Sequence, residues 1–148
     1  MTQNQIGAVA ATGTIWMNTG NSTGVSFSYT TSYKELSSLG TNFTLMSNAP
    51  YFTMTTDGRL KYTGTNTLNF VSNAVMLGSD TGSRAIAIGK NGTIITGSDC
   101  YNDRNNFICP NVLVSLSTND YLSVFAKRSA NSASAIYQII LTAEALIS

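Results

Sequence analysis

The sequence has no histidine and few charged side chains. Of its 148 residues, 10% are charged, with 8 Lys and Arg against 7 Asp and Glu. Histidine is the commonest general base and metal ligand among side chains. A zinc site needs about four ligands, and this chain offers 2 cysteines. No basic cluster is present that could bind nucleic acid. These absences predict a protein that is not an enzyme, uses no cofactor or metal and binds no nucleic acid.

Long apolar runs are missing as well. No stretch approaches the roughly 20 apolar residues that span a bilayer. The first residues, MTQNQIGAVAATG, have neither the basic flank nor the apolar centre of a secretory signal. We therefore expect a soluble chain with no membrane insertion. Its length is typical of a single domain.

The pattern that is present has a period of two. Outside SYKELSSLG (residues 32–40), which predicts a short amphipathic helix, polar and apolar residues alternate in about eight to ten short segments. Gly, Asn, Asp and Ser separate these segments, as is typical of an all-β antiparallel sandwich of jelly-roll topology. The segments read GVSFSYT, NFTLMS, YFTMTT, RLKYT, TLNFVSNAVML, RAIAIGK, TIITG, NVLVSLS, YLSVFAKR and AIYQIILTAEAL.

Two turns can be placed. Asn91-Gly92 lies between two alternating runs, and both residue types tolerate the positive φ of a two-residue hairpin turn. We expect the strand around Ile86 and Ile88 to form an antiparallel pair with the strand around Ile94 and Ile95. Asp57-Gly58 predicts a second turn before a strand with Leu60 and Tyr62 on one face.

Two late segments are apolar on both faces. A strand in an isolated sandwich usually exposes one face to water, so these segments need a second cover. No long amphipathic helix is predicted to supply it, and we expect another copy of the chain to do so. The paired faces are Leu122, Val124 and Ala126 against Tyr121, Ser123 and Phe125, and Ile136, Ile140 and Leu146 against Tyr137, Ile139 and Leu141.

The order of the later segments resembles a known family. DGRLKYTG, LNFVSNAVML, AIAIGKNGTII and VLVSLSTNDYLSVFAKR, followed by a last apolar strand, resemble the jelly-roll domain shared by tumour necrosis factor and complement globular heads. The likeness is strongest to the compact versions found in virion and phage structural proteins. Asn119 stands where that family usually has a glycine before Asp120.

The resemblance implies one jelly-roll domain over residues 1–148, best matched over residues 51–148, with residues 1–50 as either early strands or an N-terminal arm. It also implies a three-fold trimer lined by late-strand residues. The residues expected at that interface are Tyr121, Phe125, Tyr137, Ile139 and Leu141.

Other candidate sites lie in loops. Tyr101, Asn102, Asp103 and Asn105 belong to the longest predicted loop, residues 98–111, and are candidates for ligand contact. We expect Trp16, in the run TIWM, to be partly buried in the core or in an interface. Asp80-Thr81-Gly82 matches the active-site turn of aspartic proteases but lacks the preceding apolar strand, so a plain loop is favoured.

Cys100 and Cys109 enclose an eight-residue segment, YNDRNNFI. One interpretation is a disulfide or redox pair that closes this loop. The other, which we favour on sequence grounds, is two free thiols in a reducing compartment.

The sequence therefore predicts a non-enzymatic homotrimer that serves as a minor capsid, decoration or fibre-head protein in the virion and is assembled in host cytoplasm. Other capsid proteins would be its partners. The alternative is a head domain that binds a host receptor or glycan. An aspartic hydrolase that uses Asp80 is the third hypothesis.

Overall fold

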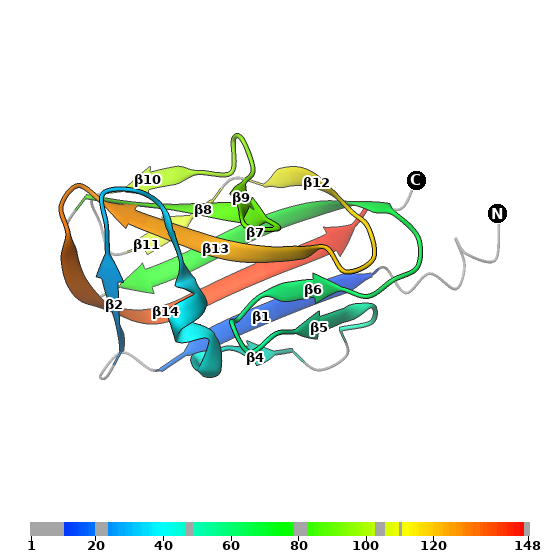
Figure 1. The fold of residues 1–148 in the computed structure, drawn as a ribbon, viewed down its shortest axis with the longest axis horizontal. Coiled ribbons are helices and arrows are strands. Elements are labelled where there is room, and N and C mark those ends of the chain that lie inside the picture. Colours follow the sequence, from blue (N-terminus) through cyan, green and yellow to red (C-terminus); the bar gives the residue numbers. More distant parts are fainter. Residues whose placement is uncertain are drawn as a thin grey trace.

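In the computed structural model the chain forms two antiparallel β-sheets packed face to face (Figure 1). The structure describes residues 11–19, 24–46, 49–78, 83–102, 106–109 and 111–146, with the backbone alone for residues 106–108. The chain passes from one sheet to the other between β2 and β3, β3 and β4, β4 and β5, β6 and β7, β7 and β8, β10 and β11, β12 and β13, and β13 and β14. This repeated crossing gives the jelly-roll sandwich that the period-two pattern predicted.

One sheet, here called sheet A, has β7 and β14 side by side at its centre. Its path runs β11-β7-β14-β1-β4, with β12 also paired to β7 and β2 to β14. β1 thus lies inside the sheet, between β14 and β4. The strands of sheet A are β1 (Thr12–Asn18), β2 (Val25–Tyr29), β4 (Thr44–Leu45), β7 (Leu68–Gly78), β11 (Asn106–Ile108), β12 (Val112–Leu116) and β14 (Ser132–Ala145).

The other sheet, sheet B, lies nearer the viewer in Figure 1. Its path runs β10-β8-β13-β6-β5, with β3 also paired to β13 and β9 to β8. A 3₁₀ helix, η1 (Leu36–Asn42), follows β3. The strands of sheet B are β3 (Lys34–Glu35), β5 (Phe52–Met54), β6 (Leu60–Tyr62), β8 (Arg84–Lys90), β9 (Thr93–Ile94), β10 (Cys100–Asn102) and β13 (Tyr121–Arg128).

The core lies between the inward faces of the two sheets. Three aromatic rings pack at its β5–β6 end, where Phe52, Tyr62 and Phe70 have ring centroids 5.2–5.5 Å apart. Gly13 lies under Phe52, and a Cβ there would come within 2.5 Å of that ring, so β1 can approach β5 this closely only with glycine. Each buried ring contributes roughly 1.5–3 kcal/mol of hydrophobic stabilisation.

Both predicted turns are confirmed. Asn91 and Gly92 have φ of 50° and 83°, and β8 pairs with β9 across them. Gly58 has φ of 68° in the turn that joins β5 to β6, where Leu60 and Tyr62 share the buried face. The predicted helix at residues 32–40 is a shorter and later 3₁₀ helix that buries Leu36 and Leu39.

The facing pattern of β14 differs from the expectation. The ladder between β14 and β7 shifts register between Ile136 and Gln138, and such a bulge turns the following residues to the opposite face. Ile136 therefore shares the core face with Ile139 and Leu141, all three with no exposed surface, while Ile140 lies on the outside.

This corrects part of the expected interface. Ile139 and Leu141 are core residues of a single subunit and have no area left for a partner. Phe125 is 8% exposed and offers almost none. The predicted loop at residues 98–111 is also wrong in part, because it contains two short strands: β10 pairs with β8 in sheet B, and β11 pairs with β7 in sheet A.

Candidate functional site

The outer face of sheet A carries an apolar row across its three central strands. Trp16 of β1 lies opposite Ile140 of β14, and Ile140 lies opposite Val75 of β7. All three are half-buried in the single subunit, and none belongs to the core cluster. We call these three residues the outer row.

Further apolar side chains extend this surface along β7 and β12. Val71 and Leu77 lie on the outer face of β7, and Leu113 lies opposite Val71 with 69% of its surface exposed. Adjacent apolar side chains on the outer face of a sheet mark a candidate site of protein contact.

The neighbouring positions are polar but uncharged. On one side of the outer row Thr14, Thr142 and Asn73 lie opposite one another, and the Thr14 hydroxyl donates to that of Thr142 over 3.2 Å. On the other side lie Asn18 and Gln138. Depletion of charge at the centre is a feature of protein interfaces.

The outer face of sheet B is closed by its own chain. Phe125 and Ala87 lie opposite each other in β13 and β8, both are buried, and neither belongs to the core cluster. The Phe125 ring lies over Gly89, where a Cβ would come within 2.3 Å of it. The apolar side chains on this face therefore have little exposed area for a partner.

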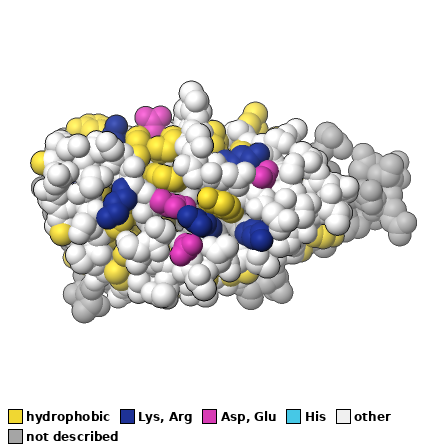
Figure 2. Space-filling view, viewed as in Figure 1, with side chains coloured by type: hydrophobic (Ala, Val, Ile, Leu, Met, Phe, Trp, Pro, Cys, Tyr) yellow, Lys and Arg dark blue, Asp and Glu magenta, His cyan; other side chains and the backbone are white. Residues whose placement is uncertain are grey.

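Charged side chains surround this closed area, and Figure 2 shows them on the face formed by sheet B. Arg59 donates two hydrogen bonds of 2.9 Å to the Glu35 carboxylate, and its guanidinium lies 4.6 Å from the ring centroid of Tyr121. The Arg59 hydrogen bonds hold the pKa of Glu35 below its ordinary value. Lys127 lies 4.4 Å from the ring centroid of Tyr33.

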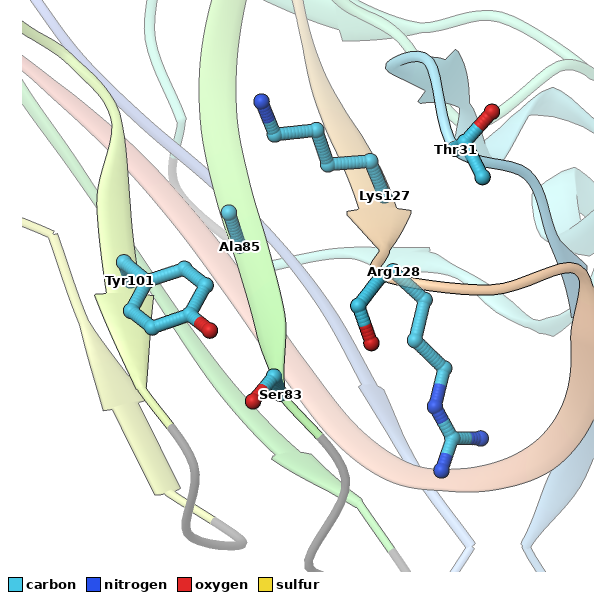
Figure 3. Close-up of a pocket in the computed structure, with 7 residues that line it drawn as sticks. Thr31, Ser83, Ala85, Tyr101, Lys127 and Arg128 are labelled. Carbon is cyan, nitrogen blue, oxygen red and sulfur yellow. The ribbon is translucent and has the colours of Figure 1, made fainter.

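A shallow pocket opens where β8, β10 and the end of β13 meet. Its volume is about 190 Å³, and its walls include Tyr101, Ser83, Thr31, Lys127 and Arg128. Figure 3 shows Tyr101 and Ser83 on one side of the pocket and Lys127 and Arg128 on the other. Tyr101 is 69% exposed. The pocket thus combines an open aromatic ring with hydroxyl groups and an ammonium group.

The expected ligand-contact residues are only partly brought to this pocket. Tyr101 lines it, whereas Asn102 is half-buried at the end of β10 and does not. Asp103, Asn105 and the Asp80-Thr81-Gly82 turn lie outside the described residues. Within the part of the chain that is described, no group of three or more His, Cys, Asp or Glu could hold a metal ion. No helix there is long and apolar enough to cross a membrane.

The remaining expected interface residues lie apart from each other. Tyr121 is half-buried beside Arg59 on sheet B, and Tyr137 is half-buried at the bulge of β14 on sheet A, near Gly24. A role for these two tyrosines in subunit contact stays a prediction. Ile140 and Val75 were not among the expected interface residues, because their outward direction depends on the register of three strands.

Solved structures with the same strand arrangement identify the fold. Vertex protein P5 of phage PRD1 superposes with a TM-score of 0.66 at 10% identity, covering 94% of this chain and 99% of that one. The chain has the fold of tumour necrosis factor and complement globular heads. Eiger TNF of S. frugiperda gives a TM-score of 0.55 at 15% identity, with 92% and 93% covered, and the zebrafish complement 1qA globular domain gives 0.54 at 10% identity, with 94% and 98% covered.

The sequence itself matches no protein-family model and no curated protein. At 10–15% identity these similarities establish the fold and leave function to be argued from surfaces.

Proposed function

We propose that the chain is a non-enzymatic structural protein of a virus particle that assembles as a homotrimer through the outer face of sheet A. The outer row of Trp16, Ile140 and Val75 carries this proposal, because it is apolar, central and uncovered in the single subunit. The partner that we propose for this face is a second copy of the chain, because other copies are present in any solution of the protein.

The composition of this face supports self-association. Burial of apolar area contributes roughly 25 cal/mol per Å², and a stable interface takes about 800 Å² from each partner. The uncharged Thr, Asn and Gln side chains beside the outer row can form hydrogen bonds across an interface without desolvating a charge. The number of three subunits rests on the resemblance to tumour necrosis factor.

The virion role rests on the fold that the chain shares with a phage vertex protein. In this proposal the trimer works by contact with other capsid proteins and is located in the virion. Its assembly would take place in the host cytoplasm.

The mass of the native protein tests the assembly. Light scattering coupled to size exclusion should give about 47 kDa for three copies of the 15.7 kDa chain. A stable mass of 15.7 kDa at micromolar concentration would overturn the proposed trimer. Antibody labelling of purified virus particles tests the structural role, which fails if the protein is absent from them.

The pocket at Tyr101 favours a second function, namely recognition of a host receptor or glycan. Exposed aromatic rings stack on sugar rings, and nearby hydroxyl and ammonium groups can form hydrogen bonds to sugar hydroxyls. Ser83 and Thr31 bring hydroxyl groups to the walls of the pocket, and Lys127 and Arg128 bring basic side chains.

A saccharide array would test this second function with a matched pair of variants. Tyr101→Ala should abolish selective binding, whereas Tyr51→Ala, which truncates another exposed tyrosine that does not line the pocket, should retain it. An array without selective binding by the unmodified protein would remove this alternative.

A further inference from the structure

The two cysteines lie where the chain crosses from sheet B to sheet A. Cys100 is the first residue of β10 in sheet B, and Cys109 directly follows β11 in sheet A. Their Sγ atoms are 3.0 Å apart. A disulfide bond is about 2.05 Å long, so the sulfur atoms would have to approach by only about 1 Å.

Backbone pairing holds both residues in place. Cys100 lies opposite Ile86 in the ladder of β8 and β10. The Cys109 N–H donates to the Ala74 carbonyl over 2.8 Å, and the Cys109 thiol lies 3.8 Å from the Ile86 carbonyl oxygen. The two sulfurs are thus positioned from two different sheets, and Ile86 lies next to both.

The two thiols differ in accessibility. Cys109 is 2% exposed and belongs to the core, whereas Cys100 is half-buried at the core edge. We propose that Cys100 and Cys109 form an intrachain disulfide that ties sheet B to sheet A when the chain meets a low-molecular-weight disulfide such as oxidised glutathione.

The environment of each sulfur determines which cysteine reacts first. The hydrogen bond from the Cys109 thiol lowers the pKa of Cys100 against the opposing effect of burial. The same hydrogen bond, together with burial, raises the pKa of Cys109. Since the thiolate is the nucleophile, Cys100 attacks first.

The exchange then proceeds in two steps. The Cys100 thiolate attacks one sulfur of the oxidant, whose S–S bond breaks, and the released thiolate takes up the proton that Cys100 lost. Cys109 next attacks the Cys100 sulfur of the mixed disulfide, and its proton goes to the second released thiolate. The two protein thiols lose two electrons in total, and the oxidant becomes two thiols.

Peptide mapping tests the bond directly. Cleavage after Lys90, Arg104 and Lys127 places the cysteines in separate peptides, residues 91–104 and 105–127. After incubation with oxidised glutathione, alkylation and digestion without reductant, these two peptides should be recovered as one linked species from a chain of monomeric mass under denaturing conditions. Recovery of both peptides unlinked, or linked between two chains, would overturn the proposal.

Thermal unfolding supplies a second readout. Closing a loop of this size should raise the unfolding temperature of the oxidised protein by about 5–10 °C, while Cys100→Ser should show no change with oxidant. If that variant fails to fold, the peptide map of the unmodified protein still decides. The outcome is independent of the trimer proposal, because both sulfurs lie between the sheets and not on the outer face of sheet A.

Discussion

The outer faces of the two sheets are built differently. On sheet B, Phe125 and Ala87 are already buried by their own subunit, and ion pairs surround them. On sheet A, Trp16, Ile140 and Val75 form an apolar row that remains half-buried. A late strand can thus be apolar on both faces because its own subunit covers the outer face, as on sheet B, or because another subunit covers it, as we propose for sheet A. Only the second arrangement requires a partner.

Charged side chains are also distributed unequally between the two sheets. Among the described residues of the sheet A strands, Glu144 is the sole charged side chain, whereas sheet B and its adjoining turns carry most of the others. Charged groups resist transfer from water into an interface. The comparison therefore predicts that sheet A assembles and sheet B faces solvent or other partners.

The largest expected effect comes from placing a charge in the outer row. Ile140→Asp should convert the assembly to the 15.7 kDa monomer, because a carboxylate would be buried without a partner. Thr53→Asp, at an exposed position of β5 in sheet B, is the control and should leave the mass unchanged. An unchanged mass for Ile140→Asp by light scattering would show that the outer row is not the subunit interface.

Truncating Phe125 on the outer face of sheet B should lower the stability of the fold and leave the oligomer intact. Phe125→Ala should lower the free energy of unfolding by about 3 kcal/mol, in line with other buried aromatic residues. Thr53→Ala, at an exposed position of β5 in sheet B, should cost less than about 0.5 kcal/mol. Urea unfolding at fixed protein concentration measures both, and loss of the oligomer in Phe125→Ala while the fold persists would assign the interface to sheet B.

The ion pair beside Phe125 should have a smaller effect. Glu35→Gln removes the negative charge and one of the two oxygens that accept hydrogen bonds from Arg59, and it should lower the free energy of unfolding by about 1–2 kcal/mol. Asp57→Asn, which weakens the exposed 3.2 Å contact with the same arginine, should have almost no effect. Equal losses of unfolding free energy in the two variants would show that the contacts of Arg59 with Glu35 and with Asp57 contribute equally, whatever their burial.

Acid should have the smallest effect among these tests. Because the folded-state pKa of Glu35 is lowered, its stabilising contribution is complete above the ordinary carboxyl pKa of about 4 and is lost as pH falls through the lowered value. The free energy of unfolding of the unmodified protein should therefore decrease below about pH 4. It should decrease less steeply for Glu35→Gln. Parallel pH profiles for the two proteins would contradict this assignment.

Local turn chemistry could be predicted from the sequence. Asn91-Gly92 predicted a hairpin because both residues adopt positive φ at small cost. In the structure β8 pairs with β9 there. Alternation also located Leu60 and Tyr62 on the buried face of β6.

The candidate interface could not be predicted in the same way. One extra residue between Ile136 and Gln138 reverses the faces of the rest of β14, and alternation alone does not reveal a bulge. Ile139 and Leu141 were therefore expected outside and are inside. The outer row joins residues from three strands far apart in the sequence, so it appears only when their register is known.

Trp16 reports directly on whether the outer row is buried in the assembly, because it is the chain's one tryptophan and lies in that row. Its fluorescence should be followed during dilution, beside light scattering, with iodide as a quencher. Emission should shift to longer wavelength and quenching should rise as the mass falls from about 47 to 15.7 kDa. Dissociation with no change in either signal would place the interface elsewhere and contradict the assignment to sheet A.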